Sequence, residues 1–405
     1  MFNKRVLLWG LYDFANSILI GNLTLYFVQY VVVDKGLPDI VFSIALTIGS
    51  VLLLFLAPGV GIFIDHGTRK IKLIRMLSVL ILVGGISLGL LQNAILLLVF
   101  FLMARVAYQV SLVPYNTVLI DVAEAGKRGF ASGFGEFCNW SGYLLGLIIT
   151  LPIINGTFTL FGTGRQGVFI PAGLLFLILG LPFLITHKEQ QREKKKVKIW
   201  KGFKDLIGFL KNKDHRGAAI FLLIYFLANN AAAAFVAFGP LYFEVVEKMP
   251  DQSKVILTAL TLVSAAVGAI IGGKLNDKYG SYPILFGVLV TWAMALVLVI
   301  LGSGFWYLVP FTIVVGLLMG AFGSIGRKYL TDLIPQEDAG RFFGIYSLSI
   351  KMSAFIGLPL WSVTALLFAS TGDDRYRYSM LSLSLLLFAS LYILKRFKKI
   401  LNIRS

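Results

Sequence analysis

The sequence predicts an all-α membrane protein in which twelve transmembrane helices form two related six-helix bundles. Three observations predict it: the composition, a series of long apolar runs, and an internal repeat. Of the 405 residues, 58% are hydrophobic and only 14% are charged, against about 25% charged residues in an average soluble domain. A soluble chain of this length has no interior for so much apolar surface. The net charge of +17 does not indicate a nucleic-acid partner, because most basic residues lie between the apolar runs.

Each apolar run is long enough to cross the hydrocarbon core of a bilayer as a helix of about twenty residues. The runs span residues 5–33, 39–64, 71–92, 94–119, 129–152, 167–186, 217–244, 253–275, 282–302, 305–326, 342–370 and 378–395.

The distribution of Lys and Arg predicts the orientation of these helices. If the N-terminus is inside, 29 of the 37 basic residues fall on the inner side, 6 fall in outer loops, and Arg105 and Lys351 lie within runs. This bias follows the positive-inside rule and requires an even number of crossings. We therefore expect both termini to be cytoplasmic, in the plasma (inner) membrane if the source is prokaryotic.

Two landmarks repeat at nearly the same interval. Gly61 precedes Asp65 by four positions after the second run, and the same pattern ends at Asp277, 212 positions after Asp65. After the fourth and tenth runs stand Asp121 and Asp332, which are 211 positions apart. The halves are therefore predicted to be parallel repeats related by a pseudo-two-fold axis along the membrane normal.

This repeat divides the chain into an N-terminal bundle (1–186), a cytoplasmic linker (187–216) and a C-terminal bundle (217–405). In the linker, Trp200, Phe203, Leu206, Ile207 and Leu210 recur at helical spacing between lysines. That pattern favours an amphipathic helix on the inner membrane surface. The alternative is a linker whose lysines only follow the topology.

The repeated loop motifs predict a cytoplasmic gate. Glycine permits a tight turn, an aspartate can accept hydrogen bonds from a neighbouring helix N-terminus, and arginines can bridge carboxylates. Ordinary loop chemistry is the alternative. The predicted gate consists of Gly61, Asp65, Arg69, Asp121, Arg128, Asp277, Asp332 and Arg341.

Four ionisable residues lie well within apolar runs, away from the run ends: Asp13, Arg105, Glu136 and Lys351. Each costs at least ~2.5–3.5 kcal/mol there, so each needs a reason. Asp13 either serves transport or packs helices together with Asn16. Glu136 is the candidate protonatable switch, and its alternative role is a permanent partner of Lys351 or Arg105.

Arg105 either grips an anionic substrate group or ties helices together through Glu136 or Asp13. Lys351 has the same two interpretations. Polar groups in the seventh run either bind substrate or form interhelical hydrogen bonds. The predicted substrate-binding or coupling set is Asp13, Asn16, Arg105, Tyr108, Gln109, Glu136, Asn229, Asn230 and Lys351.

The loop Gly61–Lys70 and its second copy resemble the signature of the major facilitator superfamily, with His66 in place of the usual arginine. Other segments resemble the family of the yeast vacuolar amino-acid effluxer linked to autophagy, and its bacterial relatives. These segments are Tyr12-Asp13-Phe14-Ala15-Asn16-Ser17, Tyr115-Asn116, Tyr225-Phe226-Leu227 with Asn229, and Arg327 through Pro335, Glu337, Phe342-Phe343-Gly344 and Lys351. The resemblance implies transport of a small solute, with amino acids as the best-known case.

We therefore expect a monomeric secondary active transporter that works by alternating access. Its expected partners are membrane lipids, protons coupled through Glu136 or Asp13, and an amino acid or other carboxylate-bearing metabolite. Alternatives are an exporter of drugs, sugars, peptides or lipids, and a non-transporting scaffold or receptor. No nucleophile–base set or phosphate-binding loop indicates an enzyme. With one cysteine and three histidines in predicted loops, no metal or cofactor is expected.

Overall fold

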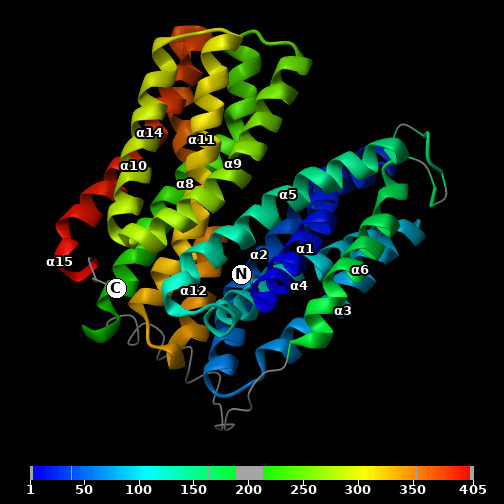
Figure 1. Cartoon of the computed structure of the whole chain (residues 1–405). Coiled ribbons are helices and arrows are strands. Elements are labelled where there is room, and N and C mark those ends of the chain that lie inside the picture. Colours follow the sequence, from blue (N-terminus) through cyan, green and yellow to red (C-terminus); the bar gives the residue numbers. More distant parts are fainter. Residues whose placement is uncertain are drawn as a thin grey trace. The chain divides into compact units, whose positions relative to one another are not determined.

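The computed structural model describes residues 3–37, 39–154, 156–159, 161–162, 164–187, 213–352 and 354–401. Within these ranges the chain is almost entirely helical (Figure 1). Eleven helices are long and apolar enough to cross a membrane, and Ile356–Leu367 is a shorter apolar helix.

The helices of the first half are α1 (Lys4–Gln29, continued by a π-helical turn at Tyr30–Asp34), α2 (Asp39–Asp65), α3 (Lys70–Leu90), α4 (Ala94–Val122), α5 (Arg128–Ile154) and α6 (Phe169–Thr186). Those of the second half are α8 (Arg216–Val245), α9 (Asp251–Tyr279), α10 (Ser281–Leu298), α11 (Phe305–Leu333), α12 (Ala339–Lys351), α13 (Ala354–Leu367), α14 (Arg375–Arg396) and α15 (Lys398–Leu401). Short 3₁₀ turns at Ala125–Lys127, Gln166–Val168, Lys213–His215, Val299–Leu301, Gln336–Asp338 and Ala369–Asp374 connect them.

Some helices begin where a side chain accepts hydrogen bonds from the first backbone amides, and some end at a glycine that allows a sharp turn. The side chain of Asn93 accepts hydrogen bonds from the first amides of α4, as an N-cap should. Gly280 separates α9 from α10 at φ +85°, a backbone conformation that favours glycine. Prolines inside membrane helices, such as Pro114 in α4, are tolerated because neighbouring groups satisfy the backbone locally.

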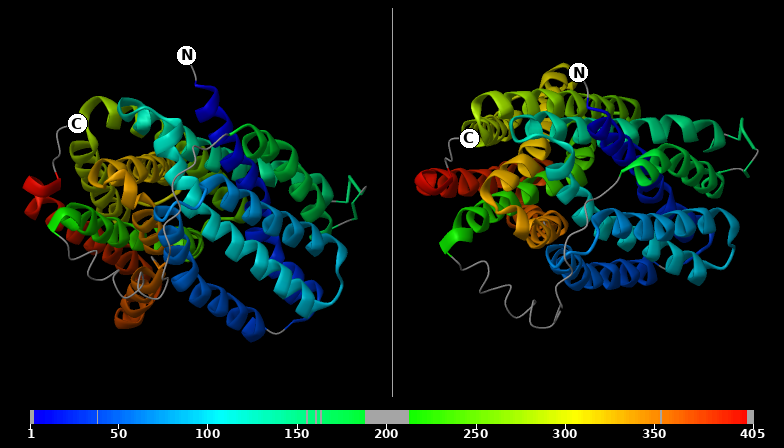
Figure 2. Two further views of the ribbon diagram at one scale, coloured as in Figure 1. Left: turned by 90° about the horizontal axis from the view of Figure 1, so that it is seen from below. Right: turned by 60° about the horizontal axis from the view of Figure 1, so that its bottom comes forward.

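The chain forms two compact units. Unit 1 comprises Met1–Glu124, Cys138–Phe203 and Glu337–Ser347, and unit 2 comprises Ala125–Phe137, Lys204–Gln336 and Leu348–Ser405. In unit 1, α1 packs on α6 and α4, and α3 packs on α4 and α6. In unit 2, α8 packs on α14 and α11, and α10 packs on α11 and α14 (Figures 1 and 2). The two units therefore repeat one packing scheme.

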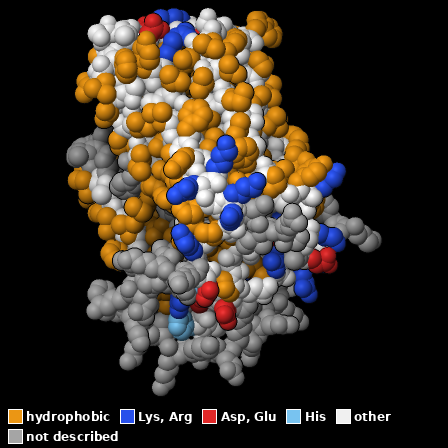
Figure 3. Space-filling model, turned by 90° about the vertical axis from the view of Figure 1, so that its left-hand side faces the viewer, with side chains coloured by type: hydrophobic (Ala, Val, Ile, Leu, Met, Phe, Trp, Pro, Cys, Tyr) orange, Lys and Arg blue, Asp and Glu red, His pale blue; other side chains and the backbone are white. Residues whose placement is uncertain are grey.

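Hydrophobic side chains dominate the outer face seen in Figure 3, while Lys and Arg gather toward one end of it. Exposed leucines such as Leu366 and Leu385 suit a surface that faces lipid, where an apolar side chain costs nothing.

Two predicted runs differ from the structure. The run 305–326 ends too early, because α11 continues to Leu333 through Arg327 and Lys328. The run 342–370 is not one helix but two, α12 and α13. The remaining runs match their helices to within a few residues. The predicted surface helix around Trp200–Leu210 lies outside the described residues, and the division at 187–216 stays a prediction.

Candidate functional site

In unit 1, the carboxylate of Asp65 caps the N-terminus of α12. The amides of Gly340 and Arg341 donate to its two oxygens at 2.7 and 2.9 Å, and the guanidinium of Arg341 lies 3.6 Å away. A Cβ on Gly61 would collide with the backbone at Gly340. Glycine therefore permits the close approach, and the carboxylate faces the positive end of the helix dipole.

In unit 2, Asp277 makes the equivalent contacts with the N-terminus of α5. The amides of Gly129 and Phe130 donate to its carboxylate at 2.7 and 2.6 Å. Gly133 and Gly273 lie at the same close contact of α5 with α9. The hydrogen bonds expected for both loop aspartates are therefore present, whereas their role in gating stays a prediction.

The other two predicted gate carboxylates are each held by a lysine. Lys70 Nζ lies 2.6 Å from Asp121, and it also donates to the carbonyl of Thr117 at 3.3 Å. In unit 2, Lys328 Nζ lies 2.7 Å from Asp332, and Ser281 donates to the same oxygen at 2.9 Å. The predicted gate residue Arg69 is exposed. The cation that pairs with Asp121 is the buried neighbour Lys70, which the predicted gate did not include.

These lysines occupy exchanged positions in the repeat. Lys70 corresponds to Ser281 and Thr117 to Lys328, each pair 211 positions apart. In each half, one of these two positions holds a lysine and the other a hydroxyl residue, but the two residue types have changed places. The predicted gate residue Arg128 begins α5.

Glu136 is paired inside unit 2, and its partner is Arg327. The two side chains lie 3.0 Å apart. The guanidinium of Arg327 also donates to the hydroxyl and carbonyl of Ser132 at 3.1 and 2.8 Å. The sequence analysis named Lys351 or Arg105 as alternative partners and did not consider Arg327, because it placed Arg327 in a loop beyond the helix. The charge of Arg327 is tolerated inside the helix because Glu136 pairs with its guanidinium and Ser132 accepts its hydrogen bonds.

The break between α12 and α13 is fastened to α8 by Asn230. Its side-chain oxygen accepts hydrogen bonds from the amides of Ile356 and Gly357, both at 2.9 Å. Within the described residues, Asn229 donates to its own helix, at the carbonyl of Tyr225. Asn230 therefore caps a broken helix. The side chain of Lys351 lies outside the described part of the chain.

In unit 1, aromatic residues join α1 to α4. Trp9 and Tyr115 stack 4.6 Å apart, and each donates a hydrogen bond to the other's carbonyl. Tyr12 bonds Ser78 of α3 at 2.8 Å. Because Trp9 lies level with Tyr115 on antiparallel helices, Asn16 lies level with about residue 108 of α4. Two of the segments behind the family resemblance thus meet here.

The face of α1 that bears Asp13 and Asn16 is buried, at 1% exposure for each. The neighbouring Ser17 packs on Gly142 of α5, where a Cβ would collide with the backbone of Phe14. Asn16 Oδ1 accepts no hydrogen bond within the described residues.

On α4, Arg105 is partly buried, and its guanidinium lies over the ring of Phe101 at 5.9 Å. No ion pair of Arg105 occurs among the described residues. Tyr108 and Gln109 are buried, and Gln109 Oε1 has no hydrogen-bond partner in this part of the chain.

A third echo of the repeat connects α1 with α8. Tyr12, Ala15 and Asn16 recur 213 positions later as Tyr225, Ala228 and Asn229. In the repeat alignment, Phe226 is the counterpart of Asp13. At the 211 offset, Gly316 is the counterpart of Arg105, and Gly320 is the counterpart of Gln109. The sequence interpretation missed this echo, although its spacing is visible in the sequence.

Comparison with known families identifies the chain. Residues 123–399, more than half of its length, match the family described as vacuole effluxer Atg22 like. The chain belongs to this family. An uncharacterised protein of Aquifex aeolicus is 24% identical over 93% of this chain and 92% of its own length.

Autophagy-related protein 22 of Vanderwaltozyma polyspora is 25% identical over 50% of this chain, which is 41% of the fungal protein. The solved structure of FucP, a major facilitator superfamily transporter in the outward conformation, superimposes with a TM-score of 0.74. It covers 98% of both chains at 13% identity, which shows the fold. The protein is thus an integral membrane protein of the Atg22-like effluxer family with the fold of major facilitator superfamily transporters, and not an enzyme.

Proposed function

We propose that this Atg22-like protein carries an amino acid or another small carboxylate-bearing solute by alternating access, coupled to proton movement. The observation that supports the proposal is the unequal charge of the two copies. Asp13 and Arg105 stand in unit 1 where the other copy has Phe226 and Gly316. The second copy folds without these charges, so the cost of two ionisable groups in the membrane points to a role in transport.

The positions of these groups suit a zwitterion. Asn16 lies level with Tyr108 on α4, and Arg105 is about one helical turn away from that level, a rise of roughly 5 Å. In this proposal, Asp13 and Asn16 accept the substrate ammonium group, while Arg105 donates to its carboxylate.

The coupling proposal rests on the ion pair of Glu136 with Arg327. Protonation of Glu136 would remove the charge that holds Arg327, so the contact between α5 and α11 would loosen. In this proposal, the hydrogen bonds that Asp65 and Asp277 make to helix N-termini close the cytoplasmic face. They break when that face opens and form again when it closes. We also propose a monomer in the plasma membrane, with both termini cytoplasmic.

Purified protein in liposomes tests the cargo. We expect labelled amino acids to enter by counterflow and under an inward proton gradient. Arg105→Gln is expected to lower the uptake at least tenfold and Arg105→Lys less, whereas Lys72→Gln on the exposed face of α3 leaves uptake unchanged. If no amino acid moves under either condition, the substrate proposal fails; flux of sugars or drugs in the same assay would support the alternative cargo.

The coupling is tested separately. Glu136→Gln is expected to retain counterflow but lose acceleration by the proton gradient. Because the variant leaves Arg327 buried without its partner, Glu136→Gln/Arg327→Gln is the folding control. Retention of full gradient-driven uptake by Glu136→Gln would overturn the coupling role of this residue.

A further inference from the structure

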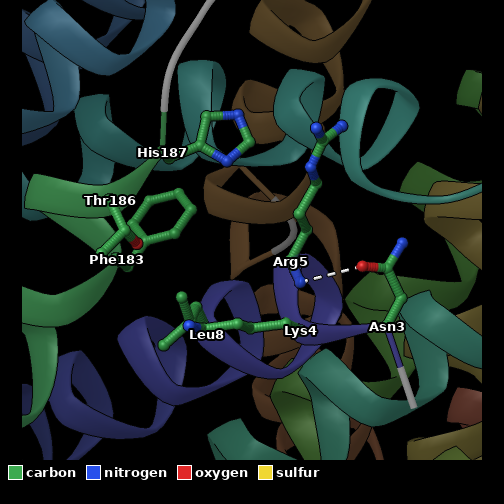
Figure 4. Close-up of a pocket in the computed structure, with 7 residues that line it drawn as sticks. All are labelled: Asn3, Lys4, Arg5, Leu8, Phe183, Thr186 and His187. Carbon is green, nitrogen blue, oxygen red and sulfur yellow. Dashed lines mark hydrogen bonds between the residues drawn. The ribbon is translucent and has the colours of Figure 1, made fainter. Parts of the chain in front are cut away.

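A cavity of about 390 Å³ lies in unit 1 between the beginning of α1 and the end of α6 (Figure 4). Its lining consists of Asn3, Lys4, Arg5, Leu8, Phe183, Thr186 and His187. In Figure 4, the guanidinium of Arg5 and the imidazole of His187 extend toward the same side of the cavity. The lining holds two permanent cations and no carboxylate, so the cavity suits an anion.

Neither cation is neutralised by the described protein. Lys4 and Arg5 form no ion pair among the described residues. The amide of Arg5 is capped by the side chain of Asn3 at 3.0 Å, whereas its guanidinium is free to meet a ligand. Leu8 and Phe183 add an apolar wall. An occupant therefore needs an anionic group attached to an apolar body.

In unit 2, the crevice equivalent to this cavity is occupied by the chain itself. The crevice between the beginning of α8 and the end of α14 is filled by α15 of the chain itself. Leu401 is fully buried, and its carbonyl accepts a hydrogen bond from Tyr329 at 2.6 Å. Ile400 packs against Gly217, which stands 212 positions after Arg5.

The first half has Arg5 where the second half has Gly217, 212 positions later. In unit 2, Ile400 packs against this glycine. In unit 1, a cationic side chain lines the cavity at the same place.

We propose that an anionic phospholipid fills this cavity, with its phosphate bound by Lys4, Arg5 and His187. The glycerol and the first acyl carbons then lie on Leu8 and Phe183. Both helices are membrane spans that end here, so the cavity opens at the level of the lipid headgroups. Basic pockets between helix ends are suited to anionic headgroups, and a zwitterionic lipid supplies no net charge to match them. The site requires neither the proposed substrate nor the proposed coupling.

The test uses the full chain in nanodiscs of phosphatidylcholine, with and without phosphatidylglycerol. We expect phosphatidylglycerol to raise Tm by several degrees, and native mass spectrometry to show one retained anionic lipid. Lys4→Gln/Arg5→Gln should lose both effects. The matched control Lys398→Gln/Lys399→Gln removes two exposed charges from α15 and should keep both.

Other results overturn the proposal. Equal responses of the two double variants would mean that charge alone attracts the lipid, without a site. An equal rise of Tm with inorganic phosphate in phosphatidylcholine would identify a free-anion site. If Lys4→Gln/Arg5→Gln does not fold, Arg5→Gly provides the second variant, and full retention of the lipid by Arg5→Gly contradicts the assignment.

Discussion

At the residue scale, the carboxylates Asp121 and Asp332 each pair with a lysine, although the two lysines come from different positions of the repeat. Asp121 takes its ammonium from the beginning of α3, while Asp332 takes it from one turn earlier on its own helix. Lys70 Nζ also donates to the carbonyl of Thr117. The ammonium group therefore lies beside the residue whose counterpart in unit 2 is a lysine. Either route brings one cation to one carboxylate.

This exchange predicts a rescue. Lys70→Ser removes the cation from a partly buried Asp121, and we expect a loss of about 1–3 kcal/mol in the free energy of unfolding. Lys70→Ser/Thr117→Lys copies the arrangement of unit 2 and should restore most of it. Thermal unfolding in detergent measures both, with Lys72→Ser as the control. No improvement of the double variant over Lys70→Ser would contradict the exchange.

The residue types at the sites could be predicted from the sequence better than their partners. The aspartates of the loops were found because their spacing repeats, and their helix-capping contacts follow from simple electrostatics. Arg327 was missed because a charge ends a hydropathy window, although buried partners let the helix continue. Glu136 and Arg327 are 191 positions apart, and nothing local in the sequence indicates their pairing.

At the scale of helices, α9 and α11 pack closely because small residues line both. Gly268, Gly272, Gly316 and Gly320 each lie where a Cβ would collide with the facing helix. Close backbone approach is a usual source of helix association in lipid. The corresponding surface of α4 has Arg105 and Gln109 instead, so polarity replaces close packing in unit 1.

A single methyl group tests this contact. Gly320→Ala places a Cβ against the carbonyl of Ala265, and we expect a loss of about 1–3 kcal/mol from overpacking. Gly287→Ala in α10 is the matched control, because no described atom of another element lies within 4 Å of the added Cβ. It should be neutral or gain up to ~1 kcal/mol through helix propensity. Similar Tm values for the two variants would refute the close packing.

The broken helix α12–α13 predicts a contrast between two adjacent asparagines. Asn230→Ala leaves two amides of α13 without their cap, so we expect a loss of about 1–2 kcal/mol. Asn229→Ala removes only a bond within α8 and should cost less. Thermal unfolding compares them, and an equal effect would argue against the capping role. Hydropathy cannot reveal this break, because both pieces are apolar.

At the scale of the whole molecule, the charge bias predicts that both ends of the chain lie on the same side of the membrane. Green fluorescent protein fused to either end should fluoresce in a bacterial host, because it folds in the cytoplasm. Alkaline phosphatase inserted after Gly36 or Gly156 should be active, because it requires the outer side. Phosphatase activity at either end would overturn the proposed orientation.

The number and type of the spans were predictable because apolar length and alternating charge are properties of the chain alone. The repeated packing of α1 on α6 and of α8 on α14 follows from the duplication. Side-chain pairing within each unit was not predictable in the same way, since it depends on which helix faces meet. The family match agrees with the resemblance found in the motifs.

The two halves reach one lysine for each carboxylate through different residues. A chain with Thr117→Lys alone carries both lysines. One arrangement can convert into the other through this state without leaving Asp121 beside no cation.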